Sequence, residues 1–120
     1  MGRSYRDLTV WQVSMDLVDA VYDATEDFPK RELFGLSAQM RRAAVSNPSN
    51  IAEGQARLSG PPFRLFLGHA RGSLAELSTQ IEIAKRRQLI NDKKLQELIA
   101  LCDKAGKLLN GLLESIKDRL

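Results

Sequence analysis

The sequence has little of the chemistry that marks a redox or metal-binding protein. Its 120 residues include one cysteine, Cys102, and one histidine, His69. A single cysteine excludes a disulfide within the chain and is typical of a reducing compartment. Because one cysteine and one histidine are too few for an ordinary transition-metal site, we expect no metal and no cofactor.

Long apolar stretches are also absent. No apolar run approaches the roughly 20 residues that a membrane-spanning helix needs. The opening residues 1–7, MGRSYRD, lack the apolar core of a signal peptide. We therefore expect a cytoplasmic protein with no membrane partner.

Charge is unevenly distributed along a chain whose length fits one domain, 1–120. Residues 1–36 hold 4 basic and 7 acidic side chains, residues 37–90 hold 8 and 3, and residues 91–120 hold 6 and 5. The formal net charge of +3 therefore conceals a middle segment of net +5. Such an asymmetry indicates either a polyanionic partner or a solvated helix face.

Apolar periodicity predicts four helices, over about 9–28, 37–55, 62–88 and 92–119. In the third, apolar or small residues follow alternating steps of 4 and 3: Phe63, Leu67, Ala70, Leu74, Leu77, Ile81 and Ala84. This is the seam of a helix packed nearly parallel to its neighbours. With no strand-like alternation and only short connections, the sequence predicts an all-α, up-and-down antiparallel four-helix bundle.

Several residues suit the ends and contacts of these helices. Thr9, Ser37 and Asn91 are candidate N-caps, because their side-chain oxygens can accept hydrogen bonds from the free backbone amides of a first turn. Gly54 is a candidate terminator of the second helix. Gly68, with Gly72 one turn further on, is expected to permit close approach of a neighbouring helix.

The apolar face of the fourth predicted helix is wider than one seam. Four leucines lie off that seam: Leu101, Leu108, Leu113 and Leu120. A face this wide contacts more than one neighbour, and a long, thin bundle has little interior of its own. We therefore expect the chain to form a homo-oligomer.

A polar strip on the second helix faces a matching strip on the third. Glu53 and Glu76 could form a general acid–base pair, or Arg42 could pair with either carboxylate and fix the helix register. No nucleophile–base pair, phosphate-binding glycine loop or metal-ligand spacing accompanies them. We therefore expect no enzyme activity, and a structural network of Gln39, Arg42, Ser46, Asn50, Glu53, Ser73 and Glu76.

Basic residues of the middle segment form the candidate nucleic-acid surface. Arg57, Arg64 and Arg71 are seven residues apart, which places Arg64 and Arg71 on one face of the third helix and Arg57 in the loop before it. Lys85, Arg86 and Arg87 follow near the end of that helix. Because aromatic residues are only 6% and most have core spacing, we expect binding to backbone phosphate rather than base stacking.

Several motifs in order resemble a known family. The strongest is residues 39–54, QMRRAAVSNPSNIAEG, preceded by LTVWQ at 8–12 and ELFGL at 32–36, with shorter matches as far as about residue 90. These motifs resemble the bacterial four-helix-bundle proteins first noticed as reading frames inside 23S rRNA intervening sequences. One departure is Asn47, where the family usually carries an apolar residue, typically isoleucine. Asn47 therefore needs a polar partner or marks a loosened site.

The resemblance implies an up-and-down four-helix bundle that assembles as a homopentamer and has no known catalytic activity. It also implies distant similarity to the accessory protein of diversity-generating retroelements, a basic pentameric barrel that engages nucleic acid and a reverse transcriptase. Two functional interpretations stay open. The chain is either a homo-oligomeric bundle that binds RNA or DNA backbone through its arginine-rich face, or an interaction scaffold or accessory subunit whose partner is another polypeptide.

Overall fold

The computed structural model describes residues 4–57 and 60–117, and every secondary-structure element within them is helical. The α-helices are α1 (Thr9–Glu26), α2 (Leu36–Ala56), α3 (Gly60–Arg86) and α4 (Asp92–Lys117). Two short 3-10 helices, η1 (Tyr5–Asp7) and η2 (Lys30–Glu32), precede α1 and α2. The predicted all-α class is confirmed. The last two residues of the expected fourth helix, 118–119, lie outside the described part of the chain.

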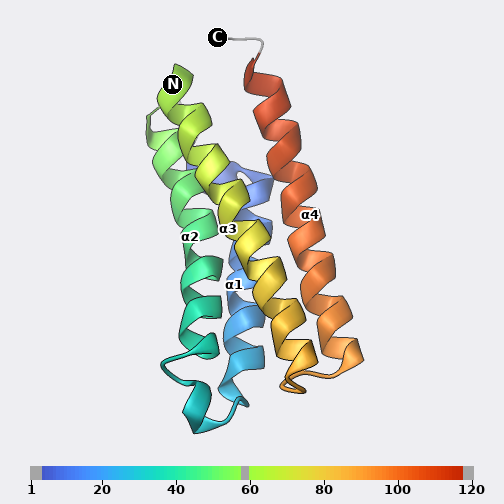
Figure 1. The fold of residues 1–120 in the computed structure, drawn as a ribbon. Helices are drawn as coiled ribbons and strands as arrows, with labels where there is room; N and C mark the ends of the chain where they lie inside the picture. Colours follow the sequence, from blue (N-terminus) through green and yellow to red (C-terminus); the bar gives the residue numbers. More distant parts are fainter. Residues whose placement is uncertain (1–3, 58–59, 118–120) are drawn as a thin grey trace.

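The four helices form a ring of neighbours. α1 packs against α2 and α4, and α3 packs against the same two helices, whereas the backbones of neither diagonal pair approach each other closely in the described chain. Figure 1 shows α3 in front and α1 behind, with α2 and α4 on either side. Consecutive helices run in opposite directions, so the bundle is a rod of about 46 × 23 × 20 Å.

Each helix contributes completely buried side chains to one core, including Leu17 of α1, Met40 of α2, Leu67 of α3 and Leu109 of α4. Every residue of the predicted α3 seam, from Phe63 to Ala84, is buried. Burying one such leucine contributes about 1.5–3 kcal/mol to the free energy of unfolding. No helix of the described chain is both long and apolar enough to span a bilayer.

Two of the predicted helix caps are wrong. Leu8 occupies the N-cap of α1 with an extended backbone and no side-chain cap, and Thr9 is the first helical residue. Gly35 occupies the N-cap of α2, and Ser37 lies buried inside the helix. Each helix begins one or two residues before the position that the polar residue suggested. Packing of the apolar face against the other helices outweighs the contribution of a single cap.

Gly54 lies buried within α2 and does not terminate it, which corrects a second expectation. A Cβ at Gly54 would lie 3.1 Å from Cδ1 of Phe63 and 3.1 Å from Cβ of Phe66. Gly54 is therefore a point of close approach between α2 and α3. A Cβ at Gly68 or Gly72 would meet nothing within 4 Å, so the expected close approach of helices at those two glycines is wrong.

Candidate nucleic-acid interface

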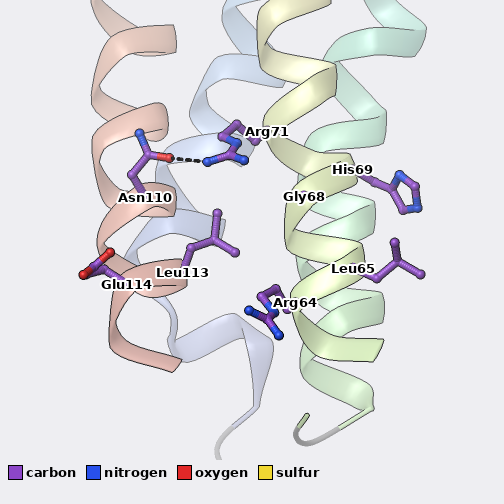
Figure 2. Close-up of a pocket in the computed structure, with 8 residues that line it drawn as sticks. All are labelled: Arg64, Leu65, Gly68, His69, Arg71, Asn110, Leu113 and Glu114. Atoms are coloured by element: carbon purple, nitrogen blue, oxygen red, sulfur yellow. Dashed lines mark hydrogen bonds between the residues drawn. The ribbon is translucent and has the colours of Figure 1, made fainter. Parts of the chain in front are cut away.

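An open groove of about 590 Å³ runs between α3 and α4. Figure 2 shows Arg64 and Arg71 extending from α3 toward α4, while His69 and Leu65 point away from it. The complete lining is Arg64, Leu65, Gly68, His69, Arg71, Asn110, Leu113 and Glu114. The structure thus brings together two of the predicted basic residues, Arg64 and Arg71, on one wall of a groove.

Helix geometry explains why these arginines share a wall. Seven residues make almost two turns, so Arg64 and Arg71 lie on one strip of α3, roughly 10 Å apart along its axis. Gly68 lies on the same strip between them and also lines the groove. Because a side chain at Gly68 would meet nothing within 4 Å, its absence leaves the floor open between the two guanidinium groups.

The two arginines are weakly engaged by their own chain. Arg71 Nη1 donates to Asn110 Oδ1 at 3.4 Å, a long contact that leaves most of its five N–H donors unused. Arg64 has no hydrogen bond or ion pair within the described chain and is exposed. Glu114 of α4 supplies the one carboxylate of the lining. The groove therefore holds two guanidinium groups and can bind a planar or tetrahedral oxyanion.

The α4 wall of the groove was not anticipated from the sequence. Asn110 and Glu114 lie one turn apart and Leu113 lies between them. The sequence shows that Asn110 and Glu114 lie beside the α4 seam and form a polar strip on the helix surface. That this strip faces Arg64 and Arg71 follows only from the register of α3 against α4 in the structure. His69 packs edge-on against Phe66 of the same helix, with ring centroids 6.0 Å apart, and is not directed at α4.

Arg57 lies outside this groove. Its Nη2 donates to Glu53 Oε1 at 2.8 Å, and its Cζ lies 5.3 Å from the centroid of the Phe66 ring. The expected pairing of Glu53 with Arg42 is therefore wrong, because Arg57 is one turn away on the same helix, where such pairs form readily. Arg57 is the C-cap of α2 and belongs to the α2–α3 side of the bundle.

The Lys85, Arg86 and Arg87 cluster forms a second, separate basic patch. At 1.5 Å per residue, the 22 positions from Arg64 to Arg86 place the patch roughly 33 Å away, at the other end of α3. Arg86 and Arg87 are exposed, whereas Lys85 Nζ pairs with Asp92 Oδ1 at 3.2 Å. The structure therefore does not join this cluster to the α3–α4 groove.

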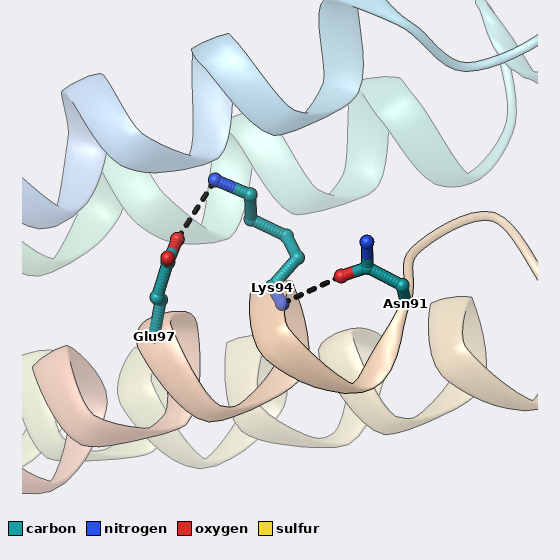
Figure 3. Close-up of polar contacts among 3 residues, drawn as sticks. All are labelled: Asn91, Lys94 and Glu97. Carbon is teal, nitrogen blue, oxygen red and sulfur yellow. Dashed lines mark hydrogen bonds and ion pairs between the residues drawn. The ribbon is translucent and has the colours of Figure 1, made fainter.

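The start of α4 lies beside this second patch and is firmly capped. Asn91 Oδ1 accepts a hydrogen bond from the Lys94 backbone N–H at 2.8 Å, which confirms the predicted N-cap (Figure 3). Lys94 Nζ donates to Glu97 Oε2 at 2.8 Å. This bond raises the pKa of Lys94 and lowers the pKa of Glu97. The charge of Lys94 is thus compensated locally.

Part of the predicted polar network joins α2 to α3. The hydroxyls of Ser46 and Ser73 share a hydrogen bond of 2.8 Å. Asn50 Nδ2 donates to the Ser46 carbonyl at 2.8 Å and to its hydroxyl at 3.0 Å. The Ser46–Ser73 bond thus joins the two helices, and Asn50 holds the Ser46 hydroxyl from within α2.

The charged members of that network do not pair with one another. Arg42, Gln39 and Glu76 line a shallow polar hollow beside Ser46, but no ion pair joins Arg42 to Glu76 within the described chain. Glu53 lies at the level of Phe66, ten residues before Glu76, so the two carboxylates lie roughly 15 Å apart along the bundle. They do not form the close acid–base pair considered from the sequence.

Two further residues that the sequence singled out, Asn47 and Cys102, are buried. Asn47 is completely buried, and neither atom of its amide has a hydrogen-bond partner within the described chain. Cys102 is buried in the core, and burial raises the pKa of its thiol to about 11 although Ser78 offers a hydrogen bond. The thiol is therefore protonated at neutral pH and is not an activated nucleophile.

Together these features define a four-helix bundle with a basic groove along two of its helices. Residues 6–111 match the family model described as 23S rRNA-intervening sequence protein, and the chain belongs to this family. The chain is also similar to the crystal structure of a protein of unknown function from the S23 ribosomal protein family of Bacteroides thetaiotaomicron. The two share 20% identity and a TM-score of 0.80, over 88% of this chain and 95% of that one.

The likeness to the Bacteroides protein establishes a shared fold. No curated protein matches the sequence. The expected similarity to the accessory protein of diversity-generating retroelements stays a prediction.

Proposed function

We propose that this chain is a non-catalytic, self-associating bundle that binds the phosphate backbone of RNA or DNA through the α3–α4 groove. The supporting observation is the placement of Arg64 and Arg71, which flank an open floor at Gly68. Neither guanidinium forms an ion pair within the described chain. A guanidinium fork binds phosphate oxygens in pairs, whereas the scarcity of exposed aromatics argues against base stacking.

Self-association strengthens the electrostatic part of this proposal. The family resemblance implies a homopentamer, and five chains of formal charge +3 carry about +15. A field of that strength attracts a polyanion far more effectively than one chain does. Binding through phosphate contacts also predicts a steep dependence on salt, because each neutralised phosphate releases condensed counterions.

A second candidate function is an interaction scaffold whose partner is another polypeptide. The observation that favours it is an exposed apolar patch of Pro61, Pro62 and Leu65 at the edge of the groove; Leu65, which also lines the groove, is 59% exposed. In this alternative the arginines serve solubility. Charge reversal at Arg64 and Arg71 would then leave partner binding unchanged, whereas Leu65→Asp would abolish it.

The first test measures binding of the nuclease-treated protein to a fluorescent RNA stem-loop and to a DNA duplex of the same length. We expect affinity to fall with salt, and the Arg64→Glu, Arg71→Glu double variant to bind at least about tenfold more weakly. Its slope of log K against log salt should also be shallower by about one for each lost phosphate contact. Unchanged affinity and slope in the double variant would exclude this groove.

The second test fills the groove without removing charge. Gly68→Leu places a side chain between the two arginines, whereas Gly72→Leu is a matched control at an equally open position outside the lining. Both changes favour helix by about 0.8 kcal/mol, so neither variant should melt below the wild type. We expect only Gly68→Leu to weaken RNA binding. Equal binding by the two variants would contradict the proposed position of the phosphate.

A further inference from the structure

Two basic sites lie at opposite ends of α3. The α3–α4 groove holds Arg64 and Arg71 near the start of the helix, whereas Arg86 ends the helix and Arg87 follows it. We call Arg86 and Arg87 the terminal patch. Both are exposed, and neither side chain has a hydrogen bond or ion pair within the described chain. Figure 1 shows that α3 runs along the rod, so the two sites mark its two ends.

The groove and the terminal patch lie on the same side of α3. The 22 positions from Arg64 to Arg86 make just over six turns at roughly 3.6 residues per turn, so the two residues lie within roughly 40° of each other around the axis. Along the axis they are roughly 33 Å apart. Ala75 and Thr79 lie on this strip between them and are small and exposed. A long ligand can therefore run close to the helix from one site to the other.

This spacing matches the repeat of a nucleic-acid duplex. One turn of B-DNA spans roughly 34–36 Å, and after one turn a strand returns to the same side of the duplex. A duplex that lies along α3 therefore presents phosphates to the groove and to the terminal patch at once. Proteins that bind double-stranded RNA likewise contact its backbone over more than one turn, about 16 base pairs.

The chemistry of the strip also favours a duplex over a single strand. The lining of the groove contains no phenylalanine, tyrosine or tryptophan, and Ala75 and Thr79 offer no surface for stacking. Proteins that hold single strands stack the bases on aromatic side chains, whereas a duplex keeps its bases paired and presents phosphates. Glu82, one turn before Arg86, is exposed on the same strip and repels phosphate. Phosphate contacts are therefore expected at the two ends of the strip and not along its middle.

We propose that the ligand of the α3–α4 groove is a nucleic-acid duplex of at least one helical turn, whose backbone also contacts the terminal patch. The inference rests on the proposed function, because the groove must bind phosphate, and it adds the form and minimum length of the ligand. Once one site has bound a rigid duplex, the second contact is intramolecular, which raises affinity beyond that of either site. A duplex too short to reach both sites loses this gain.

Duplex length tests the inference. The probes are DNA and RNA duplexes of about 6 and about 16 base pairs, which span roughly 20 and 54 Å at about 3.4 Å per base pair, and single strands of the longer length. We expect the nuclease-treated wild type to bind a longer duplex at least about tenfold more tightly than a shorter duplex or a single strand. The duplex with the larger gain, RNA or DNA, identifies the ligand.

Charge reversal at the terminal patch tests the second contact. We expect the Arg86→Glu, Arg87→Glu variant to lose at least about tenfold in affinity for the longer duplex and less than about twofold for the shorter one. The Lys30→Glu, Arg31→Glu variant is the matched control, because it makes the same charge change at exposed positions in the connection between α1 and α2. It should bind the longer duplex much more tightly than the terminal-patch variant does.

Folding is controlled by a milder variant. Because the terminal-patch side chains have no partner within the described chain, Arg86→Ala, Arg87→Ala should melt like the wild type and still weaken binding of the longer duplex. Equal wild-type affinity for the longer duplex and the single strand, or equal losses in the terminal-patch and control variants, would overturn the inference. Failure of the proposed function has a different signature, which is unchanged binding by the Arg64→Glu, Arg71→Glu variant.

Discussion

Asn47 occupies an environment that suits an apolar residue. Its side chain is completely buried, and neither its Oδ1 nor its Nδ2 has a partner within the described chain. An unpaired buried polar group costs about 1–3 kcal/mol, because it loses its hydrogen bonds to water without replacement. The sequence resemblance already pointed to this position, where the family usually has isoleucine. The expectation of a polar partner for Asn47 is not met within the described residues.

Replacing Asn47 should therefore stabilise the protein. Asn47→Leu keeps a side chain of similar branching and removes the unpaired amide, so we expect the free energy of unfolding to rise by about 1–3 kcal/mol. Urea denaturation measures this change. Asn50→Leu is the control on the same helix, and it should lower stability by about 1 kcal/mol because it removes the hydrogen bonds to Ser46. Destabilisation by Asn47→Leu would show that its amide has a partner in the assembly.

At the level of the elements, the close approach of α2 to Phe63 and Phe66 of α3 requires a glycine at position 54. Gly54→Ala would place a Cβ 3.1 Å from Cβ of Phe66 and 3.2 Å from the Phe63 carbonyl oxygen, both attached to the α3 backbone. We expect a loss of about 1–2 kcal/mol, since the helices must separate slightly. Gly72→Ala, in open space, should instead gain up to about 1 kcal/mol. Thermal denaturation of the pair checks both signs, and equal shifts would contradict the close approach at Gly54.

The elements also show how far the sequence predicts this structure. The α3 seam from Phe63 to Ala84 was predicted residue by residue, because periodicity within one helix determines which side faces the core. The starts of α1 and α2 and the role of Gly54 were not predicted, because they depend on distances between helices. The candidate groove was likewise predicted only in part. Its arginine strip follows from spacing on α3, whereas its Asn110 wall depends on the register of α4.

At the scale of the molecule, the rod of 46 × 23 × 20 Å leaves apolar side chains such as Phe34 outside its core. If these are buried between copies, folding stability depends on protein concentration. We expect the wild-type Tm to rise by roughly 5 °C between low and hundredfold higher concentration, and the Tm of Phe34→Asp to stay constant. Calorimetry across that range measures both. A wild-type Tm that does not change with concentration would show that folding and assembly are independent.

The ring of helix neighbours also has a kinetic consequence. Three of its four contacts join consecutive helices, which meet after closing only a short connection. The fourth contact, between α1 and α4, joins segments on either side of two complete helices, and closing that distance costs more chain entropy. During synthesis α4 is made last, so the α1–α4 contact forms last. Until then, the apolar side chains of α1 and α3 that pack against α4 are exposed to solvent. The step from three helices to four is therefore where this chain is most exposed to aggregation.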